Sequence, residues 1–385
     1  MPAEAGSMPT SWPASISSLS PEQASNGAAG MWPSIRRSQA RSREALPVHY
    51  ILRHSLPLAV LAFAALCGCG RYADFALPAL GPSKDVTYKV SSVSRPLLTR
   101  GTPGAWDAVD VLNPSVLVWR GKYLNLYSGF DGHTWRTGLA TSSDGLEWNK
   151  LGPVLAPDPS SWEGDYIAAN GSALLFHGRL FYWYQAARPP RIGLAQSSDG
   201  LAWHKRERPV LETGPRGSWD ERGAADPYVV SFGDFLYMYY LGQDRAHRQM
   251  LGVARSRDGV VWTRLRGNPV LEPGGPGQFD ERGVGEPAVW TAYGWYWMLY
   301  TGRDRHERRR IGLARSRDGV HWEKVGAGAL FAGRDAWNQQ VACDPAVMER
   351  GGEVRVWYGG GDVPRPDERV DGQIGLFTLT PEPAR

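Results

Sequence analysis

The sequence predicts an all-β protein, a five-bladed β-propeller with four antiparallel strands in each blade. Two repeated features and one local pattern support this fold. The phrase Ser-x-Asp-Gly-x-x-Trp occurs four times, and the segments around it alternate between apolar and polar residues as strands do. An aromatic residue opens each repeat, with spacings of 56, 57, 60 and 58, at Trp106, Trp162, Trp219, Phe279 and Trp337. A period of this length with several short strands per unit is typical of propellers.

One repeat divides into four expected strands. In the third repeat these are residues 226–231, the aromatic segment "DFLYMYYLG", the segment "MLGVARS", and "VVWTRL" after an Asp-Gly turn. We expect each turn aspartate to bind backbone amides of its own turn, since Asp side chains stabilise turns in this way. The tryptophan that follows should pack between blades. Both roles are structural, because a residue repeated in four blades does not define a unique site.

The fifth repeat stops after its third strand, "QIGLFTL". The missing strand is expected near the start of the domain, where the segment from Tyr88 has the spacing of the segment from Trp203. An N-terminal strand would then complete the last blade, which closes the ring and leaves no exposed edge. The propeller is therefore assigned to residues 85–385, with a linker at residues 69–84.

The first 68 residues are expected to lie outside the propeller. Residues 1–50 are rich in Ser, Pro, Ala and Arg without periodicity, which predicts disorder or an extension upstream of the true start. Residues 51–68 carry a positive region and a short apolar run, and the run leads into "LCGC", which resembles a lipoprotein signal. Lipidation is then expected at Cys69, and the protein would be exported and lipid-anchored at a bacterial cell envelope. An ordinary secretory signal or an uncleaved anchor are the alternatives.

Composition restricts the partners. A net charge of +4 without a dense basic block argues against nucleic acid, and contact with a membrane is expected only through the lipid. The histidines are scattered and no metal-ligand spacing occurs, so we expect no metal and no cofactor; an axial calcium ion stays open. A monomer is expected. Cys343 is interpreted as a small buried apolar residue.

Polar residues stand at equivalent points of the five first strands, four of them directly before a proline. First strands line the axis of a propeller, so these side chains should form one ring around a solvated funnel. We expect the prolines to hold the preceding residues extended. The three acids should raise one another's pKa values through repulsion and burial. The ring consists of Asn113, Asn170, Asp226, Glu286 and Asp344.

The "DP" and "EP" pairs at Asp226 and Glu286 give residues 85–380 a resemblance to the five-bladed propellers of glycoside hydrolase families 43 and 32. That resemblance implies a base in the first blade, a later Asp that adjusts the pKa, and a Glu that acts as the acid. Asp226 matches the Asp that adjusts the pKa, and Glu286 matches the acid. The position of the base is occupied by Asn113, which cannot accept a proton. Asp110 or Asp344 are then candidates for the base. Carboxyl groups about 6.5–9.5 Å apart would suit inversion.

Hydrolysis of an oligosaccharide is the main functional hypothesis, and two alternatives stay open. A non-catalytic glycan-binding lipoprotein would bind sugar hydroxyl groups through the Asn and Asp residues of the ring, among them Asn113 and Asn170, with Trp135 or Trp183 as a stacking platform. The "NP" pair of the first blade resembles mannoside phosphorylases of family 130, in which phosphate replaces water. Phosphate would then be bound by residues of the loops "GQDRAHR" and "GRDRHERRR", namely Arg245, Arg303, Arg305 or His306.

Two further arginine patterns have structural explanations. The run from Arg308 to Arg310 is expected to be a solvated turn, as charge runs usually are. The segments "WDERG" and "FDERG" bring Arg222 and Arg282 just ahead of two ring strands. These arginines would either line the pocket rim or form ion pairs between blades, and the ion pairs are favoured.

Overall fold

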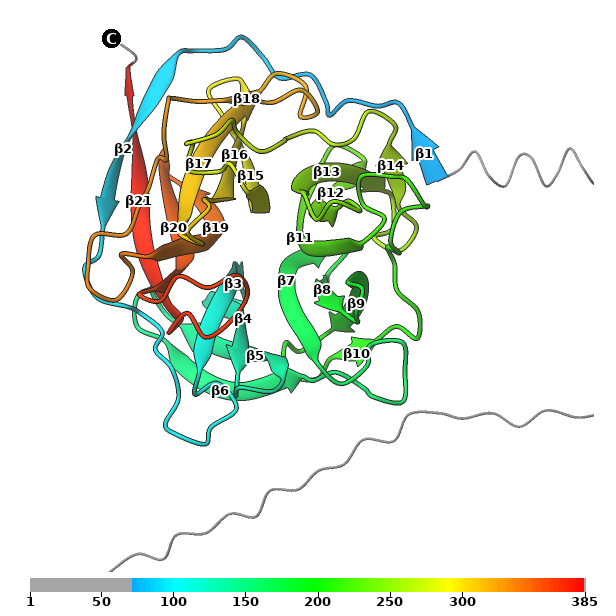
Figure 1. Cartoon of the computed structure of the whole chain (residues 1–385), viewed down its shortest axis with the longest axis vertical. Helices are drawn as coiled ribbons and strands as arrows, with labels where there is room; N and C mark the ends of the chain where they lie inside the picture. Colours follow the sequence, from blue (N-terminus) through cyan, green and yellow to red (C-terminus); the bar gives the residue numbers. More distant parts are fainter. Residues whose placement is uncertain (1–70, 384–385) are drawn as a thin grey trace, which may run out of the picture. The chain divides into compact units, whose positions relative to one another are not determined.

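The computed structural model describes residues 71–383, which form a ring of five antiparallel sheets around a central opening (Figure 1). The predicted all-β propeller is confirmed, and no α-helix occurs within this range, hence none that is long and apolar enough to cross a membrane. Blade 1 contains β3 (Asp110–Trp119), β4 (Lys122–Phe130), β5 (Trp135–Ser142) and β6 (Asn149–Leu155), and blade 2 contains β7 (Ile167–Phe176), β8 (Arg179–Ala186), β9 (Arg191–Ser197) and β10 (His204–Lys205).

The other three blades repeat this arrangement. Blade 3 contains β11 (Gly223–Phe232), β12 (Phe235–Gln243), β13 (Gln249–Ser256) and β14 (Thr263–Leu265). Blade 4 contains β15 (Gly283–Ala292), β16 (Trp295–Arg303), β17 (Arg309–Ser316) and β18 (Glu323–Lys324). Blade 5 contains β19 (Val341–Arg350), β20 (Glu353–Gly361), β21 (Gln373–Pro383) and β2 (Val86–Ser92).

The ring closes as predicted. Strand β2 pairs antiparallel with β21, with Val86 opposite Pro383 and Ser92 opposite Phe377. Blade 5 therefore combines a strand from near the start of the described chain with its last three strands, as the cyan β2 and the red β21 show in Figure 1. The indole of Trp337 donates a hydrogen bond to the carbonyl of Ser94, 2.9 Å away, next to this closure.

The fourth strands of blades 2, 3 and 4 are only two or three residues long, shorter than the sequence suggests. Strand β14 begins at Thr263, because Val260 and Val261 belong to the preceding turn. The Asp258 carboxylate accepts hydrogen bonds from the amides of these two valines, and Ser256 Oγ accepts one from Gly259 N. The same bonds recur in the other three turns, at Asp144, Asp199 and Asp318. The repeated aspartates are therefore turn residues, as expected.

Aromatic side chains of the second strands bind neighbouring blades together. Trp183 of β8 is fully buried and donates to the carbonyl of Gly259 in blade 3, and Trp357 of β20 donates to Gly145 in blade 1. Trp262 packs edge-on against Trp183, with ring centroids 6.0 Å apart. Trp183 is therefore part of the core, which rules it out as a sugar-stacking platform.

The expected linker is instead part of the folded unit. Within residues 71–84, strand β1 (Tyr72–Ala73) pairs parallel with β14, and Leu77 N donates to Asp318 O of blade 4. Pro78 O accepts from the hydroxyl of Tyr296. This segment therefore packs on blades 3 and 4. The predictions for residues 1–50, for the signal at 51–68 and for Cys69 lie outside the described residues.

Replacing Leu77 with alanine tests how much this segment contributes. The side chain is 4% exposed, so the change should lower the free energy of unfolding by about 2–4 kcal/mol through lost burial and a residual cavity. Urea unfolding followed by tryptophan fluorescence measures this loss. Leu151→Ala is the control, since Leu151 is 49% exposed. Equal effects of the two changes would show that the segment is not part of the cooperative unit.

Candidate active site

A cavity of about 380 Å³ opens at the end of the propeller where the first strands begin. Its walls are the heads of these strands, the facing ends of other strands, and the loops that join the second strand to the third in blades 2 and 5. All five residues of the predicted ring line it: Asn113, Asn170, Asp226, Glu286 and Asp344. Such a concave site with converging polar groups is the usual setting for a small ligand.

The backbone at every ring residue is left-handed rather than extended, which corrects the sequence prediction. The φ angles lie between 45° and 52° at all five positions. Each residue lies in a β-bulge, for example between Leu112 and Ser115 of β3, where the pairing with β4 shifts register. A bulge inserts one extra residue and re-aims its side chain, here toward the axis. Proline therefore does not set the geometry of the preceding residue here.

Glu286 is the residue that this backbone suits least. Asn and Asp tolerate the left-handed region better than other non-glycine residues, and four of the five ring positions hold them. A left-handed residue other than glycine costs about 1–2 kcal/mol. Glutamate persists at position 286 despite this cost, as strained residues at functional sites do.

Comparing Glu286→Gly with Glu286→Ala isolates that strain. Both variants lose the carboxylate, but only glycine adopts φ near 48° without a steric penalty. We expect the glycine variant to exceed the alanine variant by about 1 kcal/mol in the free energy of unfolding. Chemical denaturation of both proteins in one buffer measures the difference. Equal stability, or a more stable alanine variant, would contradict the strain.

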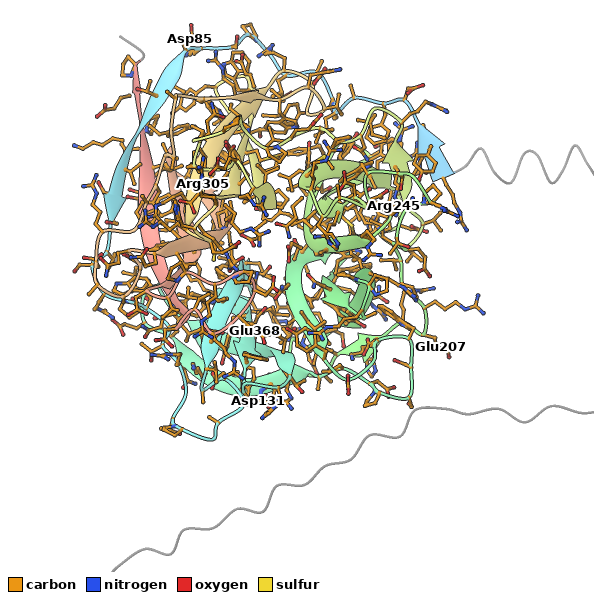
Figure 2. All side chains as sticks on the ribbon, in the orientation of Figure 1. Asp85, Asp131, Glu207, Arg245, Arg305 and Glu368 are labelled. Atoms are coloured by element: carbon orange, nitrogen blue, oxygen red, sulfur yellow. The ribbon has the colours of Figure 1, made fainter. Side chains whose placement is uncertain are left out.

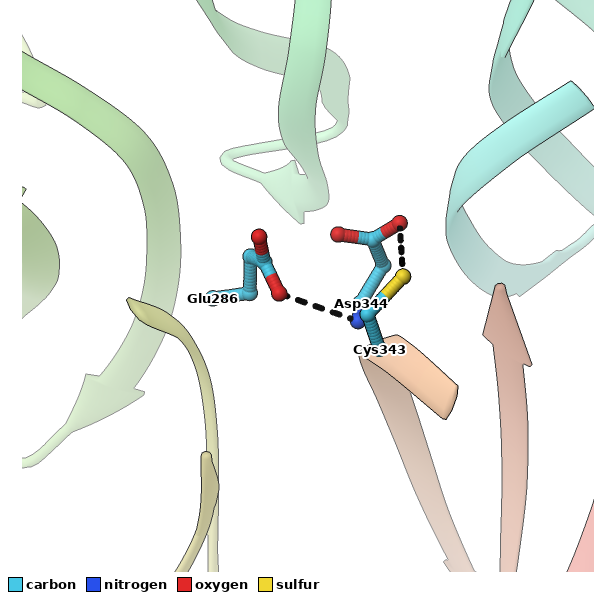
Figure 3. A group of neighbouring side chains, drawn as sticks. All are labelled: Glu286, Cys343 and Asp344. Atoms are coloured by element: carbon cyan, nitrogen blue, oxygen red, sulfur yellow. Dashed lines mark hydrogen bonds between the residues drawn. The ribbon is translucent and has the colours of Figure 1, made fainter. Parts of the chain in front are cut away.

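The acids occupy one side of the ring and the amides the other. Blades 3, 4 and 5 supply Asp226, Glu286 and Asp344, whereas blades 1 and 2 supply the two asparagines. Asn170 Nδ2 donates to Asp226 Oδ1 at 3.3 Å, and Asn113 N donates to Asp344 Oδ2 at 3.3 Å. Figure 3 shows Glu286 accepting a hydrogen bond from the Asp344 amide, with a separation of 3.4 Å.

Burial and repulsion raise the pKa values of two of these acids. Burial, followed by the negative charge of Glu286, raises the pKa of Asp226 to about 7. The same two causes raise the pKa of Asp344 well above its ordinary value. Asp344 is 6% exposed, and its Oδ2 lies 3.1 Å from the Cys343 sulfur. Asp226 is only half-buried. Asp226 is thus the more accessible group that can donate a proton near neutral pH.

Arg309 was missed from the sequence. It is 6% exposed, lines the cavity, and lies 4.0 Å from the Cys343 sulfur through Nη1. Its Nη2 donates to the carbonyls of Arg365 and Pro366. The solvated-turn interpretation is wrong for this residue because β17 begins at Arg309, while Arg308 stays exposed in the turn. The sequence did hold a signal for this position: in a strand "RRIGLARS", side chains alternate between faces, so Arg309 and Arg310 point to opposite sides.

The other proposed anion ligands divide into two groups. Arg303 lines the cavity and donates through Nη1 to Pro366 O at 3.3 Å. Arg245 and Arg305, labelled in Figure 2, are exposed and form ion pairs with Glu221 and Glu281 at 2.8 Å and 2.6 Å. Neither these two nor His306 lines the cavity.

The paired Asp-Glu-Arg segments are mainly structural. Asp220 forms an ion pair with Arg264, and Asp280 forms one with Lys324, both within a single blade rather than between blades. Arg222 differs from Arg282, because Arg222 lines the cavity and Arg282 does not.

Asp110 is a structural residue rather than a base. It is fully buried and does not line the cavity. Its carboxylate accepts hydrogen bonds from three backbone amides of the loop between β20 and β21, those of Arg369, Val370 and Gly372. Three such bonds leave little capacity for a proton-transfer role.

Trp135 lines the cavity but has little free surface. It is 5% exposed and stacks on Phe130 with ring centroids 4.7 Å apart. Its indole donates to Glu368 Oε2 at 3.3 Å. The ring therefore supports the wall of the cavity and offers no open face for a sugar.

A metal ion fits the axial acids poorly. One ligand atom from each of Glu286, Cys343 and Asp344 lies within 4.8 Å of the others. Calcium prefers six to eight oxygen ligands, whereas this group supplies one sulfur and has the cation of Arg309 beside it. The arrangement suits proton transfer and hydrogen bonding to sugar hydroxyls better.

Comparison with known proteins supports the resemblance to mannoside phosphorylases of family 130. The family model of Glyco_hydro_130, described as beta-1,4-mannooligosaccharide phosphorylase, matches residues 167–266. An uncharacterized protein of Mycobacterium tuberculosis (strain CDC 1551 / Oshkosh) is 29% identical over 55% of this chain and 75% of its own length. A 1,2-beta-oligomannan phosphorylase of Thermoanaerobacter sp. is 29% identical over 35% of this chain and 46% of its own length.

A solved structure described with the family 130 glycoside hydrolases that target β-1,2-mannosidic linkages in Candida mannan shares the fold. Its TM-score is 0.61 at 18% identity, and the match covers 81% of this chain and 98% of that one. The family match and the phosphorylase relative confirm the prediction of a carbohydrate-active protein, and the solved structure confirms the propeller fold.

Proposed function

We propose that the protein hydrolyses β-mannosidic bonds of an oligosaccharide, with Asp226 as the general acid. The observation that carries this proposal is the accessible Asp226 carboxyl in the axial cavity, whose pKa is raised to about 7. Asp226 also lies within residues 167–266, which match the family model, whereas Glu286 and Asp344 lie outside them. Relatives that act on β-linked mannosides support the substrate class.

This assignment moves the acid role from Glu286 to Asp226. Glu286 raises the pKa of Asp226 through its negative charge, and Asn170 fixes one oxygen of Asp226 by a hydrogen bond. The free oxygen of Asp226 can then protonate the leaving oxygen of the sugar. Asp344 is too enclosed for direct contact with a large substrate and serves to hold Asn113 and Glu286 in place.

Phosphorolysis is the second candidate, favoured by two further arginines at the cavity. Arg188 and Arg222 both line it and are exposed, and no hydrogen bond or ion pair within residues 71–383 engages the guanidinium of Arg222. An arginine in this state can bind phosphate. Arg303 and Arg309, in contrast, already donate to loop carbonyls, so these two arginines of the cavity are less available to an anion. Hydrolysis is therefore preferred.

The test uses the full chain with β-1,2- and β-1,4-linked mannobiose, with and without inorganic phosphate. Hydrolysis gives mannose in both buffers, and proton NMR of the first product gives its anomeric configuration. Mannose 1-phosphate formed only with phosphate would establish the second candidate. Saturable mannobiose binding without any cleavage, unchanged in Asp226→Asn, would overturn both and favour a glycan-binding protein.

A further inference from the structure

The loop between the second and third strands is much longer in blade 5 than elsewhere. It spans residues 131–134 in blade 1 and 187–190 in blade 2, four residues each, and 244–248 in blade 3 and 304–308 in blade 4, five residues each. In blade 5 it spans 362–372, eleven residues. The loops of blades 2 and 5 line the cavity, so the extra length in blade 5 adds groups to the candidate site that the repeat does not supply. Figure 1 shows this loop near β3.

The long loop is held on both sides of Asp367. On one side Pro366 O accepts hydrogen bonds from Arg303 and Arg309 of blade 4. On the other side the Glu368 carboxylate, labelled in Figure 2, accepts from the indole of Trp135 and from the hydroxyl of Tyr166. The three amide bonds to Asp110 fix the rest of the loop, so residue 367 is carried to a defined place.

Asp367 itself is unengaged. It is exposed and lines the same cavity as Asp226, together with Pro366. No hydrogen bond or ion pair among the described residues involves its carboxylate, although both neighbours in sequence are held. Its negative charge is also one of the causes that raise the pKa of Asp226, which places the two carboxyl groups within electrostatic reach.

The candidate site otherwise lacks a base. Asn113 has no proton-accepting group, Asp110 lies outside the cavity, and Asp344 is enclosed. Glu286 lines the cavity, but one of its oxygens already accepts a hydrogen bond from the Asp344 amide. A hydrolase that inverts configuration needs a second carboxylate to accept a proton from water.

We propose that Asp367 is this general base, an inference that rests on the proposed hydrolysis. The Asp367 carboxylate takes one proton from a water molecule as the water oxygen bonds to the anomeric carbon. The bond from that carbon to the glycosidic oxygen breaks, and the leaving oxygen takes the proton of Asp226. One water is consumed, and the released sugar carries the inverted configuration.

The experiment compares the full-length wild type with Asp367→Asn on an aryl β-mannoside, with and without sodium azide. We expect the variant to lose about 10²–10⁴-fold in kcat, the usual contribution of a general base. Azide is a nucleophile that needs no deprotonation, so it should restore turnover and give a glycosyl azide of inverted configuration. Asp371→Asn is the matched control, because Asp371 is on the same loop, pairs with exposed Arg100 at 2.8 Å and does not line the cavity.

The outcomes separate the two proposals. A wild type that cleaves no mannoside would reject the proposed function, and the base with it. A wild type that hydrolyses mannosides while Asp367→Asn stays within about threefold of it would overturn the base alone. A large loss that azide does not restore would also overturn it, since a disturbed loop would impair every nucleophile. Cleavage that requires phosphate would exclude the base, because phosphate attacks without one.

Discussion

Asparagine in place of Asp226 is expected to lower kcat for mannobiose cleavage by about 10²–10⁴-fold, with a much smaller change in KM. The amide keeps the shape of the side chain and can keep the hydrogen bond with Asn170. It cannot donate a proton to the leaving oxygen in the way that a carboxylic acid does. The loss should therefore fall on the chemical step rather than on binding.

The dependence of activity on pH tests whether Asp226 acts in its protonated form. Burial and the charge of Glu286 raise the pKa of Asp226 to about 7, and the acid must be protonated to act. Wild-type activity should therefore be present below this value and fall as the pH rises through about 7. The Asp226→Asn variant should show no fall of this kind in its residual activity.

A change of leaving group provides the control. An aryl mannoside with an acidic phenol needs little help from a general acid, so the same substitution should cost far less on that substrate. The measurement is kcat for both substrates in both proteins. An equal loss on the two substrates, or a basic limb that persists in the variant, would contradict the role of Asp226 as the acid.

The fold could be predicted because every blade meets the same physical demand. Each blade buries both faces against its neighbours, so an aromatic second strand recurs in all five blades and the turn aspartate in four of them. The same requirement predicted that a fourth strand must complete blade 5, and β2 supplies it by pairing with β21. The segment at 71–84 could not be predicted in this way. It belongs to no repeat, although Leu77 is as buried as a blade residue.

The site could be predicted only where it follows the repeat. The ring was found because its five members share a position, but their bulged backbone was not, since the proline after four of them suggested an extended chain. Asp110 was misassigned although it stands three residues before Asn113, and an odd spacing in a strand places side chains on opposite faces. Asp367 lies in a loop that obeys no periodicity, and only the fold brings it to the cavity.

Methionine in place of Arg309 is expected to lower the free energy of unfolding by about 3–5 kcal/mol at neutral pH. The guanidinium is buried beside Cys343 and holds the loop through the carbonyls of Arg365 and Pro366. Its positive charge offsets the repulsion among Asp226, Glu286 and Asp344, since it lowers the pKa values of Asp226 and Asp344 against the effects of burial and of Glu286. Its removal leaves three acids without this counter-charge.

The loss should depend on pH in a direction set by the acids. The pKa values of Asp226 and Asp344 are raised in the folded state, so both groups take up protons at a higher pH than ordinary carboxyl groups do, and they repel less once protonated. Stability from such groups is present at low pH and falls as the pH rises through their folded pKa values. The deficit of Arg309→Met should therefore be smaller at about pH 5 than at about pH 8.

Denaturant unfolding at the two pH values measures this difference, with Arg308→Met as the control because Arg308 is exposed and one residue away. The control should stay within about 0.5 kcal/mol of the wild type at both values. If Arg309→Met loses the same free energy of unfolding at both pH values, Arg309 acts through packing and loop anchoring alone. A deficit that shrinks toward low pH would mean that its charge is what allows three carboxyl groups to share one axis.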